Sequence, residues 1–356
     1  MQIGIVGCGV VAQTMHIPHV VELPGVELAA LCDPAADRLA TLADRYNVPG
    51  RYEDVTAMLA DRPPLDAVIV LSPMQHHAAA VEQTLEAGVH TLVEKPLAAS
   101  PAEAARLAAL ADASEAVAMV AYMKRYAPAF ERARTEIAAL DRIDLVTAYD
   151  VDPDHGRILE DVYDLVPGEL PAELLAESEA KREADSLAAI DSEDPELAAA
   201  YAWHLEHICH DVNLLHALFG SVTTIEHATL GDRYLTATIR FEDDVTCLLT
   251  SGNSDRPWFE DWIRVDTPEG ELTLEYFNPF IKNDPATLRS REWSTGDGRS
   301  DTTYRGPPRE PFKRELERFV ACCRGTTSVQ TTFDEAVADV RLVADFFGEI
   351  HDSPVA

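Results

Sequence analysis

Short runs of β-branched residues alternate with alanine-rich helical segments over residues 1–125, and this alternation most constrains the fold. Two of the intervening segments, Ala35–Tyr46 and Ala78–Ala87, have helical spacing. The strand-like runs are QIGIVG, VELAALCD, LDAVIVLS, HTLVEK and AVAMVAY. Such alternation is typical of a parallel sheet with helices on both faces. The sequence therefore predicts an α/β domain over residues 1–124.

The remainder of the chain, residues 125–356, has a different pattern. A helical stretch, HLEHICHDVNLLHALFG, precedes alternating apolar and polar runs that the turns FEDD and PEG separate as hairpins. These runs predict an α+β domain with a large open sheet, mixed or antiparallel. Residues 151–200 are acidic and rich in alanine, and we expect them to be a helical insertion that flanks the site as a solvated helical pair. Residues 311–350 predict two amphipathic helices that return toward the first domain.

The charge balance excludes some classes of partner. The chain has 29 lysine and arginine residues against 62 aspartate and glutamate residues, a formal net charge of -33. Nucleic acids and anionic membranes carry the same sign of charge, so we expect neither as a partner. A dense acidic surface with few lysines is similar to that of proteins from salt-loving microbes, because molar salt screens the self-repulsion. We therefore expect a halophilic protein.

The cysteines and the N-terminal residues bear on the compartment. The six cysteines form no CxxC pair and have no zinc-like spacing, so we expect reduced, mostly buried thiols and no metal site. The sequence begins directly with a strand-like run, without a basic region or a cleavage site, and has no apolar stretch long enough to span a bilayer. These features predict a cytoplasmic protein.

The first predicted strand runs into GCGVVA, the GxGxxA form of the dinucleotide-binding fingerprint. Gly7 permits the tight turn, and Gly9 lets the backbone approach a pyrophosphate. Ala12 is small enough for the following helix to pack on the strand. The N-terminus of that helix, at Val10 and Val11, faces the anion. The pattern predicts a dinucleotide-binding site.

Asp33 ends the second predicted strand, in the sequence ALCDP. At this position a carboxylate accepts hydrogen bonds from the adenosine ribose hydroxyls, and its charge repels a 2′-phosphate. Arg38 lies nearby and is able to hold a phosphate, so we expect NAD as the cofactor, with NADP possible. The alternative interpretation of Asp33 is a solvated aspartate at the end of a strand.

Two further motifs follow the fingerprint in a fixed order. The turn SPMQHH follows the strand LDAVIVL, and EKP follows the next predicted strand. With these motifs the chain resembles the glucose-fructose oxidoreductase and inositol dehydrogenase family (the Gfo/Idh/MocA type), whose members carry a TPxxxH turn and an EKP motif at about this spacing. The likeness continues in AYMKRYAPAF and FKRELERFVACC, and residues 151–200 match least.

The resemblance implies a cofactor site and a catalytic lysine. The family's TPxxxH turn, EKP glutamate and aromatic-Arg segment correspond here to Ser72, Pro73, His77, Glu94 and Arg125. In such proteins the EKP lysine stands beside the nicotinamide, and its peptide bond to proline is commonly cis. Lys95 would then hydrogen-bond the reacting hydroxyl, while the preceding glutamate anchors the loop.

The resemblance also implies a base on the first helix of the second domain. The family's DxxxHxxD stripe corresponds to Glu206, His210 and Asn213, which fall on one face of a helix. A carboxylate there can orient an imidazole, whose pKa near neutrality suits a base for the hydroxyl proton. The chain departs from the stripe twice, with Glu and Asn in place of Asp.

Other interpretations of this helix remain open. His204, His207 and His210 are candidates for a metal cluster, although His204 and His210 point about 120° apart on a helix. His210 is alternatively a core histidine bonded to the backbone. Tyr149 and Trp203 are candidates to line the substrate pocket, together with Asn213.

The sequence predicts an NAD(P)-dependent dehydrogenase or reductase acting on CH–OH groups of a sugar, cyclitol or related polyol. In this prediction Lys95 positions the hydroxyl, His210 takes its proton and Glu206 orients the base. Two alternatives are an NAD-dependent glycosidase acting by transient oxidation and a cofactor-binding regulator without turnover. Because an open apolar sheet face must be covered, we expect a homodimer or homotetramer. The substrate and the physiological direction are not predicted.

Overall fold

The computed structural model describes residues 1–61, 64–153, 155–294 and 298–352. The chain forms two compact units. The first comprises Met1–Tyr122, Val162–Glu206 and Phe312–Arg341, and the second comprises Met123–Asp161, His207–Pro311 and Leu342–Ala356. Two compact units do not have to fold independently of each other. The domain boundary at residue 124 therefore stays a prediction.

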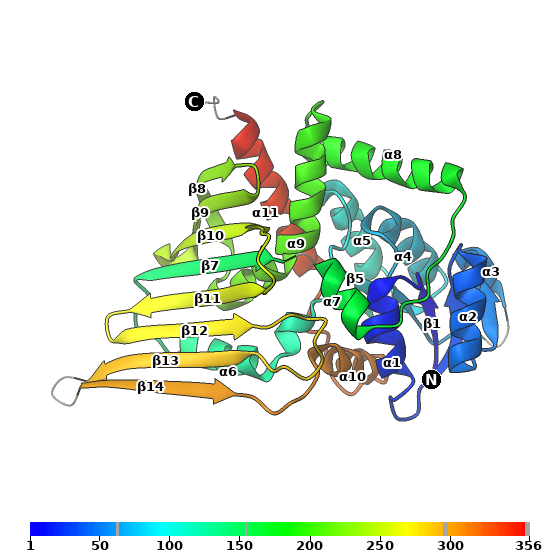
Figure 1. The fold of residues 1–356 in the computed structure, drawn as a ribbon, viewed down its shortest axis with the longest axis horizontal. Helices are drawn as coiled ribbons and strands as arrows, with labels where there is room; N and C mark the ends of the chain where they lie inside the picture. Colours follow the sequence, from blue (N-terminus) through cyan, green and yellow to red (C-terminus); the bar gives the residue numbers. More distant parts are fainter. Residues whose placement is uncertain (62–63, 154, 295–297, 353–356) are drawn as a thin grey trace. The chain divides into compact units, whose positions relative to one another are not determined.

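The first unit contains a parallel sheet of six strands in the order β3-β2-β1-β4-β5-β6 (Figure 1). The central strands β1 and β4 are buried on both faces, because consecutive residues along them are inaccessible. Their sequences are therefore continuous apolar runs. The predicted parallel α/β arrangement is confirmed. The strands are β1 (Gln2–Val6), β2 (Glu27–Cys32), β3 (Gly50–Tyr52), β4 (Ala67–Val70), β5 (His90–Glu94) and β6 (Ala118–Ala121).

Helices cover this sheet, and local sequence sets where several of them begin. Ser100 caps α5 by accepting a hydrogen bond from the backbone of Glu103, and Asp54 caps α3 in the same way through Ala57. The helical segments up to residue 112 are η1 (Ala12–His16), α1 (Ile17–Val20), α2 (Ala36–Tyr46), α3 (Val55–Ala60), η2 (Met74–His76), α4 (His77–Glu86) and α5 (Pro101–Asp112).

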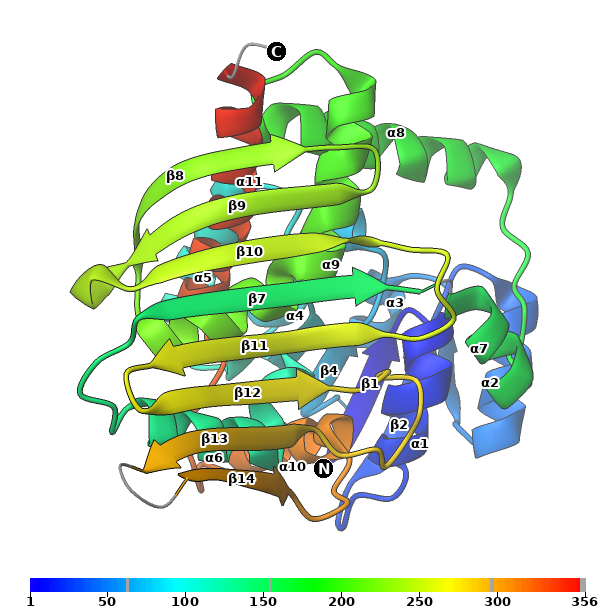
Figure 2. The same cartoon turned by 60° about the vertical axis from the view of Figure 1, so that its left-hand side comes forward.

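The second unit contains a mixed sheet of eight strands in the order β14-β13-β12-β11-β7-β10-β9-β8 (Figure 2). Strands β7 and β10 pair in parallel, and the other neighbours are antiparallel. The predicted hairpins at FEDD and PEG join β9 to β10 and β11 to β12, so the predicted fold class is confirmed. The strands are β7 (Leu145–Asp152), β8 (Val222–Leu230), β9 (Tyr234–Phe241), β10 (Thr246–Asn253), β11 (Glu260–Thr267), β12 (Gly270–Tyr276), β13 (Thr287–Ser294) and β14 (Gly298–Arg305).

Strands β13 and β14 were not expected from the sequence. Their sequences, TLRSREWS and GRSDTTYR, lack the apolar alternation of a half-buried strand. They extend one side of the sheet, where ion pairs such as Arg289–Glu275 and Arg291–Glu271 join side chains of neighbouring strands. The sheet is therefore larger than its apolar pattern indicates.

The predicted insertion and the C-terminal segment are largely helical. Residues 151–200 hold α7 (His155–Val162), α8 (Ala172–Ala189) and the start of α9 (Pro195–Phe219), and the side chains of α8 are mostly exposed. Residues 311–350 hold α10 (Pro311–Cys323) and most of α11 (Phe333–Asp352). The other helical segments are η3 (Met123–Tyr126), α6 (Pro128–Ile137) and η4 (Glu242–Asp244).

Two general expectations are answered by the fold. All six cysteines lie among the described residues as free thiols, and only Cys323 is not fully buried. Within the same described part of the chain, no helix is both long enough and apolar enough to cross a membrane.

Candidate active site

The fingerprint loop joins β1 to the first helical segment and has the geometry that a dinucleotide requires. Gly7 has a φ of +88°, and a Cβ there would lie 2.6 Å from the backbone of Leu71, so only glycine fits. A Cβ built on Gly9 meets no heavy atom of the described residues within 4 Å. The backbone at Gly9 is therefore open to an approaching pyrophosphate, as the fingerprint predicts.

Asp33 follows β2 and is buried, with 2 % of its surface exposed. Its carboxylate accepts hydrogen bonds from the backbone of Cys8 (2.7 Å) and of Ala35 (2.8 Å). It also pairs with the Arg38 guanidinium at 2.8 Å. This pairing offsets part of the negative charge that would repel a 2′-phosphate, so Asp33 does not by itself exclude NADP.

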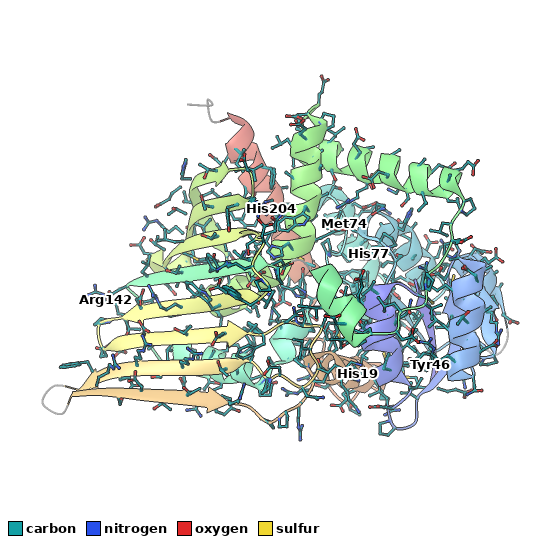
Figure 3. The ribbon with its side chains drawn as sticks, in the orientation of Figure 1. His19, Tyr46, Met74, His77, Arg142 and His204 are labelled. Carbon is teal, nitrogen blue, oxygen red and sulfur yellow. The ribbon has the colours of Figure 1, made fainter. Side chains whose placement is uncertain are left out.

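His77 connects the SPMQHH turn to the EKP loop. Its two ring nitrogens lie 2.7 Å from the carbonyl oxygen of Ser72 and 2.8 Å from that of Pro96. Burial lowers the pKa of His77 more than these two carbonyls raise it, and a neutral ring donates to one carbonyl at a time. Met74 and His77, both labelled in Figure 3, lie in the segment after β4. The contact explains why the two motifs occur together.

Glu94 ends β5 and is buried beside His16, a residue that the sequence analysis did not single out. Its Oε1 lies 2.9 Å from His16 Nε2, and its Oε2 accepts a hydrogen bond from the backbone of Lys95 (3.1 Å). Burial opposes ionisation of Glu94, yet the hydrogen bond and the charge of His16 outweigh it and lower its pKa. An ionised Glu94 therefore holds the backbone of the EKP loop, and the Lys95–Pro96 bond is cis.

The Lys95 side chain is only partly buried, and its ammonium donates to the backbone carbonyl of Glu206 at 2.6 Å. The Glu206 carboxylate pairs with Arg182 of α8 at 3.2 Å. The structure thus brings together two of the three predicted catalytic residues, Lys95 and Glu206. The contact is made through the backbone of the glutamate.

Two other predicted residues of α9, His210 and Asn213, lie in the second unit. His210 is partly buried. Asn213 is fully buried, and its amide oxygen accepts a hydrogen bond from Arg125 at 3.0 Å. Of the aromatic candidates, Trp203 stands edge-on to His204 at 4.7 Å, while Tyr149 stacks on Trp262 at 5.4 Å. Tyr149 and Asp150 are consecutive in β7, so their side chains point to opposite faces of the sheet.

A buried charge cluster in the second unit was not predicted. The Lys124 ammonium lies 2.5 Å from Asp261, 3.0 Å from Asp211 and 3.6 Å from Asp150, and all four side chains are almost inaccessible. Burial disfavours the charge of Lys124, but the three carboxylates outweigh it and raise its pKa. Burial, together with the charge of Asp150, outweighs the effect of Lys124 and raises the pKa of Asp261 to about 6.

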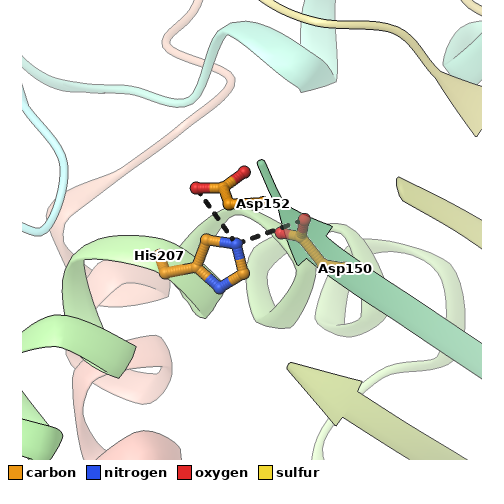
Figure 4. Close-up of side chains that lie close together, drawn as sticks. All are labelled: Asp150, Asp152 and His207. Atoms are coloured by element: carbon orange, nitrogen blue, oxygen red, sulfur yellow. Dashed lines mark ion pairs between the residues drawn. The ribbon is translucent and has the colours of Figure 1, made fainter. Parts of the chain in front are cut away.

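His207 extends this cluster (Figure 4). Its Nε2 lies 3.3 Å from Asp150 and 3.4 Å from Asp152, and its Nδ1 lies 3.0 Å from the Ser251 hydroxyl. Burial opposes the charged ring, but the two carboxylates outweigh it and raise the pKa of His207 to about 10. Asp150, Asp152 and His207 are close enough to share a metal ion, as are Asp150, Asp211 and Asp261. The Lys124 ammonium lies among the second group of three and offsets the charge of its aspartates.

Comparison with known proteins identifies the first part of the chain. Residues 1–122 match the family described as "Oxidoreductase family, NAD-binding Rossmann fold" (GFO_IDH_MocA). Over these residues the chain is similar to that family. The sequence-based assignment is therefore confirmed, as are the cofactor class NAD(P) and the fold class.

Individual relatives match over different lengths. D-xylose 1-dehydrogenase (NADP(+)) 2 of Haloferax volcanii is 26 % identical over 96 % of this chain and 95 % of that protein. The putative oxidoreductase YceM of Salmonella typhimurium is 36 % identical over 38 % of this chain, a match that spans 43 % of that protein. The structure of aldose-aldose oxidoreductase from Caulobacter crescentus, complexed with glycerol, has a TM-score of 0.75 and 19 % identity, and covers 99 % of this chain and 98 % of its own. At this identity the last likeness shows the fold alone.

Proposed function

We propose that the protein is an NAD(P)-dependent dehydrogenase or reductase that acts on a hydroxyl-bearing carbon of a sugar, cyclitol or related polyol. The observation that carries the proposal is the anchoring of Lys95. His16, Glu94 and His77 hold the EKP loop at the carboxyl end of β5, in the same sheet that carries the fingerprint loop. Ligands of such sheets bind at the carboxyl ends of the strands.

Each residue has a definite task in this proposal. The bound nicotinamide supplies the site that accepts or donates the hydride. Lys95 donates a hydrogen bond to the reacting oxygen and stabilises the negative charge that develops on it. His210 accepts the hydroxyl proton in the oxidative direction. The backbone carbonyl of Glu206 holds the Lys95 ammonium. Gly7, Gly9 and Asp33 hold the dinucleotide.

The substrate class is inferred from the relatives. Proteins similar to this chain include D-xylose 1-dehydrogenase (NADP(+)) 2, the galactose 1-dehydrogenase of Pseudomonas fluorescens and the D-apiose dehydrogenase of Paraburkholderia graminis. A small polyhydroxyl substrate is common to these names. We therefore propose an aldose or a similar polyol, with Trp203 and Tyr149 as candidate pocket residues.

A substrate screen at molar salt tests the proposal. Aldoses, inositols and sugar acids are each incubated with NAD and with NADP, and reduced cofactor is followed by absorbance. We expect reduction with at least one sugar. If both cofactors bind but no member of the panel is oxidised, the proposed substrate class is wrong. Release of a leaving group from an aryl glycoside without net NADH would instead indicate the glycosidase.

The compartment and the oligomeric state of the protein are also proposals. We propose that it works in the cytoplasm as a homodimer or homotetramer, because the second unit presents a broad sheet with exposed apolar residues such as Leu248 and Trp293. Light scattering at molar salt checks the assembly. A monomer at micromolar concentration would contradict this proposal without affecting the chemistry.

A further inference from the structure

Residues 163–178, which connect α7 to α8 and include the first turns of α8, are fastened to the fingerprint loop by Gln13. The Gln13 side chain donates to the carbonyl of Val166 (3.1 Å) and accepts from the backbone N–H of Val166 (2.8 Å). The same amide nitrogen donates to the carbonyl of Cys8 at 2.9 Å. One side chain therefore ties this connection directly to the loop that faces the pyrophosphate.

A second fastening lies at the start of α2. A Cβ added to Gly168 would come within 2.7 Å of Arg38 Cζ and 2.8 Å of Ala35 Cβ, so the backbone of the connection is packed against both residues. One residue later, the N–H of Glu169 donates to the carboxylate of Asp37 at 3.3 Å. The connection thus lies directly on the segment that follows β2.

A third fastening lies on the other side of β1, in the turn after β4. The Ser178 hydroxyl, on α8, accepts a hydrogen bond from Gln75 Nε2 at 2.8 Å and lies 2.8 Å from His76 Nε2. Gln75 is itself buried, with 5 % of its surface exposed. The end of the connection is therefore held at the SPMQHH turn.

These fastenings place residues 163–178 across the cofactor edge of the sheet. Strand β1 lies between β2 and β4, and dinucleotides bind outside the carboxyl ends of the strands where the strand order reverses. Between Glu169 and Ser178 the chain passes from the β2 side of β1 to the β4 side, and Figure 1 shows this connection passing β1 and α2 on its way to α8. We propose that residues 163–178 form a strap that gates the dinucleotide, so that NAD(P) enters and leaves only when the strap detaches.

A gate has a kinetic signature that a direct contact lacks. Because the closed strap blocks both entry and release, loosening it raises the two rate constants by the same factor and leaves the dissociation constant unchanged. Losing a direct contact to the cofactor raises only the release rate, and affinity falls. With a gate, the observed binding rate also reaches a plateau at high cofactor concentration, because opening of the strap limits it.

The experiment follows the fluorescence of NADH and of NADPH by stopped flow, with the full chain at molar salt and without a sugar. Gln13→Met removes both hydrogen bonds to Val166 and keeps the side-chain length. We expect the plateau rate and the release rate to rise together by a factor of about 10 to 100, the effect of losing one or two hydrogen bonds. Gly168→Ala, which pushes the strap away from Arg38, should raise both rates by an independent route.

Gln83→Met is the matched control. Gln83 lies on α4, where its side chain contacts Thr56 and the carbonyl of Ala79. The same chemical change there should leave the plateau and the release rate at parental values.

Three results would overturn the proposal. These are a parental binding rate that rises linearly without a plateau, parental release rates in both Gln13→Met and Gly168→Ala, and a loss of affinity with an unchanged entry rate. If neither nucleotide binds, the strap proposal and the cofactor assignment both fail. If gated binding is observed but no sugar is oxidised, the strap is supported and only the proposed substrate class fails.

Discussion

Two lysines of this chain, Lys95 and Lys124, differ in their burial and in the groups that their ammonium ions contact. Lys95 is partly exposed, and its ammonium contacts one backbone carbonyl, while neighbouring residues hold the loop that carries it. Lys124 is buried and contacts three carboxylates. A charge committed to three buried partners contributes to the fold. A charge on a fixed loop that donates to a backbone carbonyl is able to bind a reacting oxygen instead. On this difference we base the proposal that Lys124 is structural and Lys95 is catalytic.

The largest effect is expected from Lys124→Met. The change leaves Asp150, Asp211 and Asp261 buried together without their cation, and breaking a buried charge network typically costs about 3–5 kcal/mol. Denaturant unfolding at molar salt measures the loss in unfolding free energy. Lys313→Met is the control, because the ion pair of Lys313 with Glu22 lies at the surface. This change should alter stability by no more than about 0.5 kcal/mol.

If Lys124→Met has the same unfolding free energy as the parent, Lys124 is not the structural lysine of this comparison. In that case the three aspartates tolerate the loss by taking up protons, and the cluster does not stabilise the second unit. A folded Lys124→Met protein that has lost turnover would instead give Lys124 the catalytic role assigned here to Lys95.

The second-largest effect is expected in the pH dependence of the unfolding free energy. It tests the structural role of the buried cluster that contains Lys124 and His207. The pKa of His207 is raised from 6.5 to about 10, so the folded state binds this proton more tightly than the unfolded state. The resulting stability is fully present below pH 6.5 and is lost as pH rises toward 10. We expect a loss of at least about 1.4 kcal/mol across this window, the value of one pKa unit.

Unfolding free energies measured through that window test the prediction. His207→Asn removes the titrating ring, so its curve should lose this slope while other histidines still contribute theirs. Equal slopes in parent and variant would show that His207 is not held as a cation between Asp150 and Asp152.

The smallest effect is expected from Glu206→Gln. The Lys95 ammonium binds the backbone carbonyl of Glu206, which glutamine retains, and the lost ion pair with Arg182 is partly exposed. We expect turnover to fall by less than about tenfold and stability to change by no more than about 1 kcal/mol. A fall in turnover of a hundredfold or more would show that the Glu206 carboxylate itself takes part in the proton transfer.

Much of the fold could be predicted because its signals are local. Continuous apolar runs mark β1, β4 and β5, and the turns FEDD and PEG mark two hairpins. Strands β13 and β14 escaped prediction because charged pairs between neighbouring strands, rather than apolar alternation, accompany their pairing. Single-strand patterns do not contain that information, since it resides in the partner strand.

The candidate site was predictable only where a motif marks it. The fingerprint, the SPMQHH turn and EKP have sequence signatures, whereas His16 and Gln13 act through partners 78 and 153 residues away. A weak signal existed for Lys124, because it precedes Arg125 in a segment that the family resemblance covers. Its three aspartates, at positions 150, 211 and 261, come together only through the pairing of β7 with β11 and their packing beside α9.

The proposed mechanism depends on Lys95. The most direct test is the turnover of Lys95→Met on an identified substrate, with Lys313→Met measured as the control. Loss of one preorganised donor at the reacting oxygen predicts a fall in kcat by a factor on the order of 10² to 10³. Cofactor affinity should hardly change, and stability should stay within about 0.5 kcal/mol of the parent. The surface control should keep parental turnover. A Lys95→Met protein that turns over like the parent would remove this lysine from the mechanism and leave EKP as an ordinary turn.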